Sequence, residues 1–386
     1  MSSDGIPKEE KRRFPALVLI LVIIAVFTAV AIFLIISHII GPSFLSDIFS
    51  PRLQEITAEE FSFDIGRAKM FASFDNSIAA AGTLGIKVLG TDGIETLRDS
   101  FRMNQPAIAN SENYYIAFDI GGSSVRIFTG THVISSLEAN GTVVSASVNK
   151  NGWFCVVTQD GGGYRGVVTV YNHYGSDVFR AHIGSGFVLS AELSPDNKHL
   201  AILSFTETGS RITFYDNIDS EDEPTYRFDY SGGLIIDFTH LSNGEILAVS
   251  ADLLFTVDSQ GNRNVLYSYH DNRLGGYAYD NDFIALHLYD YGIGYQGRLV
   301  ALLADGTILG EVSLEREVLS ISAAGQSFVI LKTDGVAFFT NELDEYSMTA
   351  ESLSAAGANR ILALRGDVAL ATSDNSAVIL RREEEH

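Results

Sequence analysis

Residues 188–216 read VLSAELSPDNKHLAILSFTETGSRITFYD and contain three short β-strands separated by turns. Apolar and polar residues alternate from Leu189 to Ser194, the pattern of a strand with one buried face. The segment SPDN that follows favours a turn, because Pro presets φ and Asp and Asn bond to their own backbone. A continuous apolar run, HLAILS, and a β-branched and aromatic run, RITFY, predict two further strands.

The apolar second strand of this unit recurs along the chain. Eight copies at a spacing near 40 residues predict an all-β, eight-bladed β-propeller, in which each copy is one four-stranded blade. Seven blades is the alternative count, and a β-sandwich or β-helix is the alternative fold. The copies begin near Ser77, Tyr114, Trp153, His199, Glu245, Phe283, Ser327 and Asp367.

The two ends of the repeat region complement each other. The last repeat, residues 359–382, supplies only three strands, while an isolated alternating segment, Phe61 to Ile65, precedes the first complete repeat. We therefore expect Phe61–Ile65 to pair beside Ala377–Arg382 and close the ring, which removes the exposed strand edges.

A long apolar segment precedes the repeats. Residues 16–40 contain no charged side chain and could cross a bilayer as a helix. The run is too long for a cleavable signal peptide, which is the alternative. Basic residues 11–13 at its start predict a cytoplasmic amino terminus. The expected organisation is a cytoplasmic tail (1–13), a transmembrane helix (14–40), a juxtamembrane linker (41–57) and an extracellular propeller (58–386).

Charge and composition exclude several functional classes. The net charge of −22 disfavours nucleic acid as a partner. The single cysteine, Cys155, lies in an apolar strand and excludes an internal disulfide. No paired Cys and His spacing indicates a structural metal, and we expect no cofactor. The acidic run at 216–223 lacks the spacing of a calcium loop and is interpreted as a solvated charge run.

These features together resemble an uncharacterised family of Gram-positive bacterial β-propellers with a single amino-terminal anchor, within the WD-repeat-like and quinoprotein-like superfamily. The resemblance covers nearly the whole chain and rests on its architecture, so it assigns no functional residue. Trp153 is the only tryptophan, so the Trp-Asp ending of WD blades and the tryptophan motif of quinone-dependent dehydrogenases are both absent.

The connections between strands indicate a working face. If the strands of a blade are labelled a to d outward from the centre, the b-to-c connections lie on one face of the ring, here the b–c face. Three long connections of this type are predicted, at 159–165, 205–211 and 289–298. Tyr and Arg are enriched in binding hot spots. The candidate binding residues are Tyr164, Arg165, Arg211, Tyr289, Tyr291, Tyr295 and Arg298.

The predicted function is a non-catalytic interaction or sensory module that binds a protein or cell-envelope partner. The alternative is a surface enzyme acting on a glycan, peptide or small metabolite in the propeller channel. No catalytic motif supports the enzyme, but acid, base or metal groups that converge in the channel would favour it.

Overall fold

The computed structural model describes residues 56–159, 162–220, 223–290, 297–349, 357–373 and 377–382. Within these ranges the chain forms 32 strands in eight four-stranded sheets. No helix long and apolar enough to cross a membrane occurs in the described ranges. The predicted tail (1–13), transmembrane helix (14–40) and most of the linker (41–55) lie outside them.

Seven blades are continuous in sequence, and each runs from its inner strand to its outer strand. Blades 1 to 4 consist of β2–β5 (Met70–Phe74, Ser77–Gly82, Gly85–Gly90, Glu95–Asp99), β6–β9 (Pro106–Ser111, Tyr114–Asp119, Ser124–Phe128, Val133–Glu138), β10–β13 (Thr142–Val148, Phe154–Gln159, Gly166–Tyr171, Asp177–Ile183) and β14–β17 (Phe187–Leu193, Leu200–Thr206, Gly209–Tyr215, Tyr226–Tyr230). Blades 5 to 7 consist of β18–β21 (Ile235–His240, Ile246–Ser250, Leu253–Val257, Arg263–Ser268), β22–β25 (Arg273–Asp280, Phe283–Tyr289, Gly297–Leu303, Ile308–Leu314) and β26–β29 (Val318–Ala324, Ser327–Lys332, Gly335–Phe339, Glu345–Thr349).

Blade 8 closes the ring with strands from both ends of the repeat region. Its strands are β30 (Arg360–Arg365), β31 (Val368–Thr372), β32 (Ala377–Arg382) and β1 (Ile56–Phe61), and β1 pairs antiparallel with β32 along its whole length. Closure is confirmed, but the predicted segment Phe61–Ile65 was wrong except at Phe61. Phe63 and Ile65 are buried without joining the sheet, because residues 62–69 connect the outer strand of blade 8 to the inner strand of blade 1.

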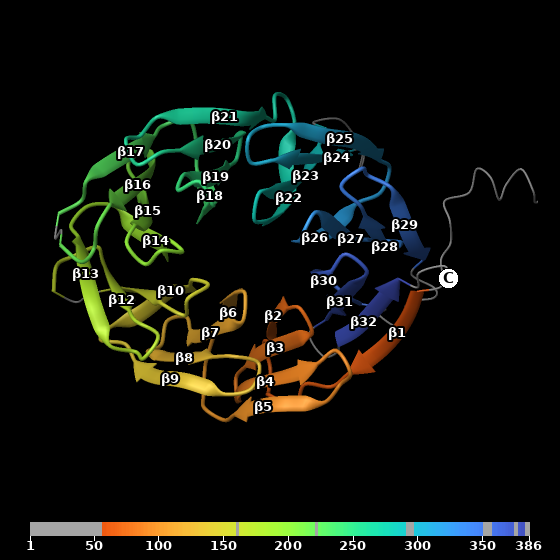
Figure 1. The fold of residues 1–386 in the computed structure, drawn as a ribbon, viewed down its shortest axis with the longest axis horizontal. Coiled ribbons are helices and arrows are strands. Elements are labelled where there is room, and N and C mark those ends of the chain that lie inside the picture. Colours follow the sequence, from red (N-terminus) through yellow and green to blue (C-terminus); the bar gives the residue numbers. More distant parts are fainter. Residues whose placement is uncertain are drawn as a thin grey trace, which may run out of the picture. The chain divides into compact units, whose positions relative to one another are not determined.

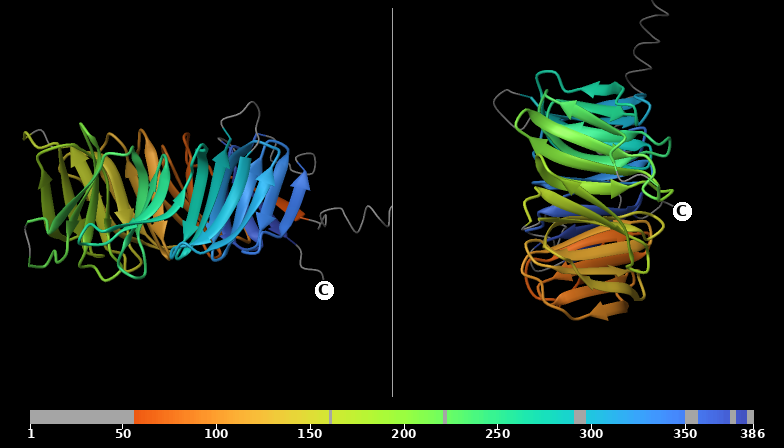
Figure 2. Two further views of the ribbon diagram at one scale, coloured as in Figure 1. Left: turned by 90° about the horizontal axis from the view of Figure 1, so that it is seen from above. Right: turned by 90° about the vertical axis from the view of Figure 1, so that its left-hand side faces the viewer.

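The blades surround a central axis, with the inner strands nearest the centre (Figure 1). Seen from the side, the strands run between the two faces of the ring (Figure 2). The eight predicted second strands are all confirmed, and each begins within one residue of its predicted start. Their continuous apolar sequence follows from burial on both sides by adjacent blades, as the fully buried β19 illustrates.

The hydrophobic core lies between the blades rather than in one centre. One cluster joins blades 3 and 4 and includes Cys155, which is fully buried as predicted. Another joins blades 8 and 1 and includes Phe61, Ile78 and Leu370. Each blade therefore depends on both of its neighbours for burial of its apolar faces, which is the physical reason for a closed ring.

Polar side chains on the inner strands tie adjacent blades together around the channel. Each donates to, or accepts from, the backbone of a neighbouring inner strand. These hydrogen bonds join Ser147 Oγ to Ala191 O (2.6 Å), His240 Nε2 to Glu192 O (3.2 Å), Ala363 N to Ser322 Oγ (2.9 Å), Ser73 Oγ to Ala363 O (3.3 Å) and Asn110 Nδ2 to Ser73 O (3.0 Å).

Candidate functional site

Only some of the predicted binding residues lie in b-to-c connections. The b-to-c connection of blade 3 is a loop that carries Tyr164 and Arg165. The prediction of a long loop at 205–211 is wrong, because β15 and β16 pair as far as Thr206 and Gly209 and leave a two-residue turn. In blade 6, Tyr289 and Arg298 are strand residues, and Tyr291 and Tyr295 lie outside the described residues.

The two strand arginines among the candidates are engaged within their own blades. Arg211 forms a bidentate pair with Asp229 on the next strand, at 2.7 Å from Nε and 3.1 Å from a terminal nitrogen. Arg298 pairs with Glu311 at 3.6 Å. Because these guanidinium groups already have carboxylate partners, a ligand would have to compete for them.

Blades 3, 4 and 5 expose six apolar side chains toward the b–c face, and this group is here named the rim patch. Phe187 and Phe205 are opposite each other in the sheet of blade 4 and are 56% and 45% exposed. The Arg165 guanidinium lies 5.4 Å from the centre of the Phe187 ring. The six exposed members are Tyr164, Phe187, Leu189, Phe205, Leu234 and Ile236.

A groove of about 390 Å³ adjoins the rim patch between blades 3 and 4. Tyr164 lines it and packs against the His182 ring, with ring centres 4.7 Å apart. Arg211 and Arg227 line it from blade 4. Two of the predicted residues, Tyr164 and Arg211, therefore do meet at one site, although the loop reasoning that selected Arg211 was wrong.

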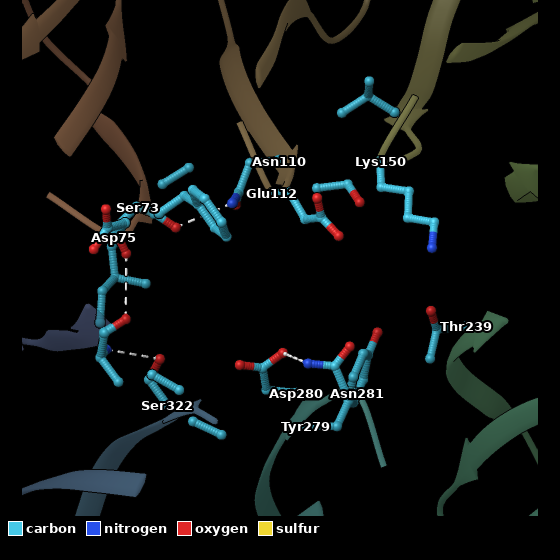
Figure 3. A pocket seen from close by; sticks show the side chains of 18 of the residues that line it. Ser73, Asp75, Asn110, Glu112, Lys150, Thr239, Tyr279, Asp280, Asn281 and Ser322 are labelled. Atoms are coloured by element: carbon cyan, nitrogen blue, oxygen red, sulfur yellow. Dashed lines mark hydrogen bonds between the residues drawn. The ribbon is translucent and has the colours of Figure 1, made fainter. Parts of the chain in front are cut away.

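A larger cavity, about 1030 Å³, occupies the channel. All eight inner strands line it, from Ser73 on β2 round to Ala363 on β30, and it opens among the a-to-b turns that carry Glu112, Lys150 and Asn281. Figure 3 shows Glu112, Lys150, Asp280 and Thr239 pointing into the same space from different blades. Its mouth lies on the a–b face, opposite the rim patch.

A cluster from blades 4, 5 and 6 stands at this cavity and is here named the acidic wall: Glu192, His240 and Tyr279 line the cavity, and Asp237 and Tyr277 adjoin Tyr279. The hydroxyls of Tyr277 and Tyr279 donate to Asp237 Oδ2 at 3.2 and 3.1 Å. Burial, reinforced by the negative charge of Asp237, raises the pKa of Glu192 to about 8. Burial also raises the pKa of Asp237.

His240 completes this wall with one unsatisfied nitrogen. Its Nε2 faces the Glu192 carbonyl at 3.2 Å, whereas its buried Nδ1 has no hydrogen-bond partner. Burial lowers the pKa of His240 to about 4, so the ring is neutral at physiological pH and Nδ1 presents a lone pair when Nε2 carries the proton. The sequence reasoning missed every member of the acidic wall.

A weak signal for these residues exists in the sequence. Inner strands alternate polar and apolar residues, and two carboxylates stand at inward positions of consecutive inner strands. The paired aromatics of Tyr277-Ala278-Tyr279 mark the next inner strand. Only the closed ring, however, distinguishes a residue that faces the channel from one that faces bulk solvent.

The remaining motifs behave as turns. Gly93, Gly152, Gly244 and Gly306 follow Asp or Asn and adopt positive φ in tight connections. The described part of the acidic run at 216–223 lies between β16 and β17, on the a–b face as expected. No group of three or more His, Cys, Asp or Glu placed to hold a metal occurs among the described residues.

A protein-family model matches residues 55–347, nearly the whole ring, and it describes a family of unknown function, DUF5711. This chain belongs to that family. No curated protein matches the sequence significantly.

Solved β-propellers share the fold of the DUF5711 chain at low sequence identity. The C-terminal WD40 domain of Sif2 superposes with a TM-score of 0.60 at 14% identity, covering 84% of this chain and 99% of that domain. BamB from Moraxella catarrhalis gives 0.53 at 13%, covering 86% and 99%. The quinohemoprotein alcohol dehydrogenase ADHIIG from Pseudomonas putida HK5 gives 0.52 at 11%, covering 86% and 77%. At these identities the likeness concerns the fold alone.

Proposed function

We propose that this chain is a membrane-anchored, extracytoplasmic interaction module whose propeller binds a protein or cell-envelope partner through the b–c face. The rim patch is the observation that carries the proposal. Exposed apolar patches of this kind mark interaction sites when polar residues border them. Here Arg165, Arg211 and Arg227 lie beside the patch or in the adjoining groove.

The rim patch is suited to binding because it combines aromatic area with directed polar groups. Phe187, Phe205 and Tyr164 have rigid rings that lose little conformational entropy on binding. The sheets beneath them are paired and buried, so the patch is presented on a preorganised surface. A protein surface that supplies an apolar anchor and a carboxylate would fit both the rings and the Arg165 guanidinium.

The membrane anchor is part of the same proposal. The uncharged run at 16–40 and the basic residues before it support a single-pass helix with the amino terminus in the cytoplasm.

The proposal is tested by replacing exposed apolar residues with Ser, first on the b–c face and then on the a–b face. The double substitution Phe187→Ser and Leu234→Ser should leave the thermal midpoint within about 2 °C, because both side chains are exposed. It should reduce partner recovery from cross-linked native membranes at least about fivefold. The matched control is Ile94→Ser with Tyr174→Ser, since both residues are exposed at turns on the a–b face. Equal recovery with the two double variants would contradict the use of the b–c face.

The acidic wall favours a second candidate function, an acid–base enzyme acting in the channel. Two neighbouring carboxyl groups with raised pKa values resemble the paired groups that such enzymes use. Asp237, however, already accepts hydrogen bonds from two tyrosines and from the Phe238 amide. An activity lost in both Glu192→Gln and Asp237→Asn, and retained when the rim patch is altered, would favour the enzyme.

A further inference from the structure

Glu192 and Asp237 differ from the acidic residues that pair with the two largely buried lysines of the protein. Lys87, with a side chain only 11% exposed, is paired with Asp64 and Glu95 at 3.2 and 3.3 Å. Lys332 is paired with Glu345 at 3.2 Å. Within the described ranges, no lysine or arginine forms an ion pair with Glu192 or Asp237, and each is only partly exposed to solvent. Buried charges are normally paired, so this site lacks a positive group.

The acidic wall offers acceptors in excess of donors. Asp237 Oδ1 accepts from the Phe238 amide at 2.9 Å, and its Oδ2 accepts from two tyrosine hydroxyls. These bonds hold the carboxylate in one orientation. Glu192 receives hydrogen bonds from the Thr239 side chain and the His240 backbone, and His240, whose Nδ1 has no partner, lines the same cavity. The missing group is therefore a positive one that also donates hydrogen bonds.

The wall is also reachable. Glu192, Thr239, His240 and Tyr279 line the 1030 Å³ cavity, which has the size of a small-molecule site and opens on the a–b face. Figure 3 shows Tyr279 and Thr239 on the border of the same open space as the charged mouth residues. The Tyr279 ring, which lines the cavity, adds aromatic surface, against which an organic cation gains further attraction.

We propose that the acidic wall binds an organic cation with N–H donors, an ammonium or guanidinium group, that enters through the a–b mouth of the channel. A divalent metal fits less well, because calcium takes six to eight oxygen ligands and the described residues contain no metal-binding group of three carboxylate or imidazole side chains. Because burial raises the pKa of Glu192 to about 8, binding of the cation is coupled to loss of the Glu192 proton, and the N–H groups then donate to the ionised carboxylate and to the lone pair of His240 in the same cavity. The cation would enter from the face opposite the rim patch, and its binding does not depend on the interaction proposed there.

The test measures binding of defined cations by isothermal titration to the full chain in detergent at physiological salt. Spermidine and the blocked tripeptide acetyl-Gly-Lys-Gly-amide represent a free polyamine and a basic side chain of a polypeptide. Tetramethylammonium has the same type of charge without an N–H donor. At least one of the two N–H probes should bind with a Kd below about 1 mM, and tetramethylammonium should bind at least about tenfold more weakly. The tighter of the two N–H probes identifies the source of the cation.

Neutral, nearly isosteric variants locate the binding site. Glu192→Gln and Asp237→Asn should each weaken the bound probe at least about tenfold, as expected for the loss of a charged hydrogen-bond acceptor. Glu112→Gln is the matched control, because Glu112 is an exposed carboxylate at the mouth of the same cavity, and it should change the Kd less than about twofold. Thermal unfolding checks that each variant is folded. If only one of the two wall variants folds, that variant is sufficient to test the site.

Three results would overturn the proposal. The first is that neither N–H probe binds the folded chain. The second is that Glu112→Gln weakens binding as much as the wall variants do, since the attraction would then come from the general negative potential. The third is that tetramethylammonium binds as tightly as the N–H probes, since donation to the acidic wall would then contribute nothing.

Discussion

The acid sensitivity of the fold should depend on one buried histidine, His287 on β23. Its ring is fully buried, and neither nitrogen has a hydrogen-bond partner. Two glycines leave the space for it: a Cβ at Gly275 would lie 2.7 Å from Nδ1, and one at Gly297 would lie 3.1 Å from Nε2. The Tyr289 ring also packs against it, with ring centres 4.4 Å apart. Among the described residues, no acidic side chain pairs with this imidazole.

Burial lowers the pKa of His287 from 6.5 to about 4. Between these values the unfolded chain binds a proton that the folded chain does not, so stability decreases as the pH falls from 6.5 to 4. At about 1.4 kcal/mol per pH unit, this interval corresponds to about 3 kcal/mol of unfolding free energy. The contribution is fully present above pH 6.5.

The substitution His287→Leu removes the titrating group and both unsatisfied nitrogens. Unfolding free energies of the full chain in detergent are measured by urea titration at several pH values from 4 to 8, with the fluorescence of the single tryptophan, Trp153, as the signal. At pH 7.5 the variant should be at least as stable as the wild type, because an unpartnered buried polar group costs about 1–3 kcal/mol. Between pH 6.5 and 4 it should lose about 3 kcal/mol less.

A surface histidine serves as the control for the acid dependence assigned to His287. His132 is exposed, so His132→Leu should leave the acid dependence of stability unchanged. Both variants keep His240, whose pKa is also lowered to about 4 and which contributes the same acid dependence to each protein. If His287→Leu and the wild type lost equal stability over this pH interval, a buried neutral His287 would be refuted.

Two further predictions concern ring closure and topology. Phe61→Ala should lower the unfolding free energy of the full chain in urea by about 3–5 kcal/mol, because Phe61 is buried between blades 8 and 1. Glu59→Ala, on the exposed side of the same strand, should lower it by less than about 0.5 kcal/mol. Equal losses in the two variants would refute a role for Phe61 in closure. Protease added to intact cells without their wall should degrade the propeller and spare an amino-terminal tag, and the reverse pattern would contradict the proposed topology.

The sequence by itself determined the fold class and the number of blades. The second strand of each blade is covered on both faces, so it must be continuously apolar, and eight such runs at a regular spacing can be counted without a structure. Closure by the amino-terminal strand also followed from counting, because the last repeat is one strand short. Cys155 as a core residue and the Asp-Gly and Asn-Gly turns depend on local chemistry and were predicted for the same reason.

Only the tertiary structure decided the pairing of individual residues and the position of the channel site. Alternation of apolar and polar residues shows that a strand has two faces, but the same alternation continues when the proposed strand is moved a few residues along the chain. The sequence therefore predicted the closing strand at 61–65, whereas β1 lies at 56–61. The sequence TETG at 206–209 is compatible with a loop or with a tight hairpin, and in the structure Thr206 pairs with Gly209, so the segment forms a hairpin. Glu192, Asp237 and Tyr279 are more than 40 residues apart from one to the next. The packing of successive blades around a common axis brings their inner strands side by side, and this packing gathers the three residues into one cluster.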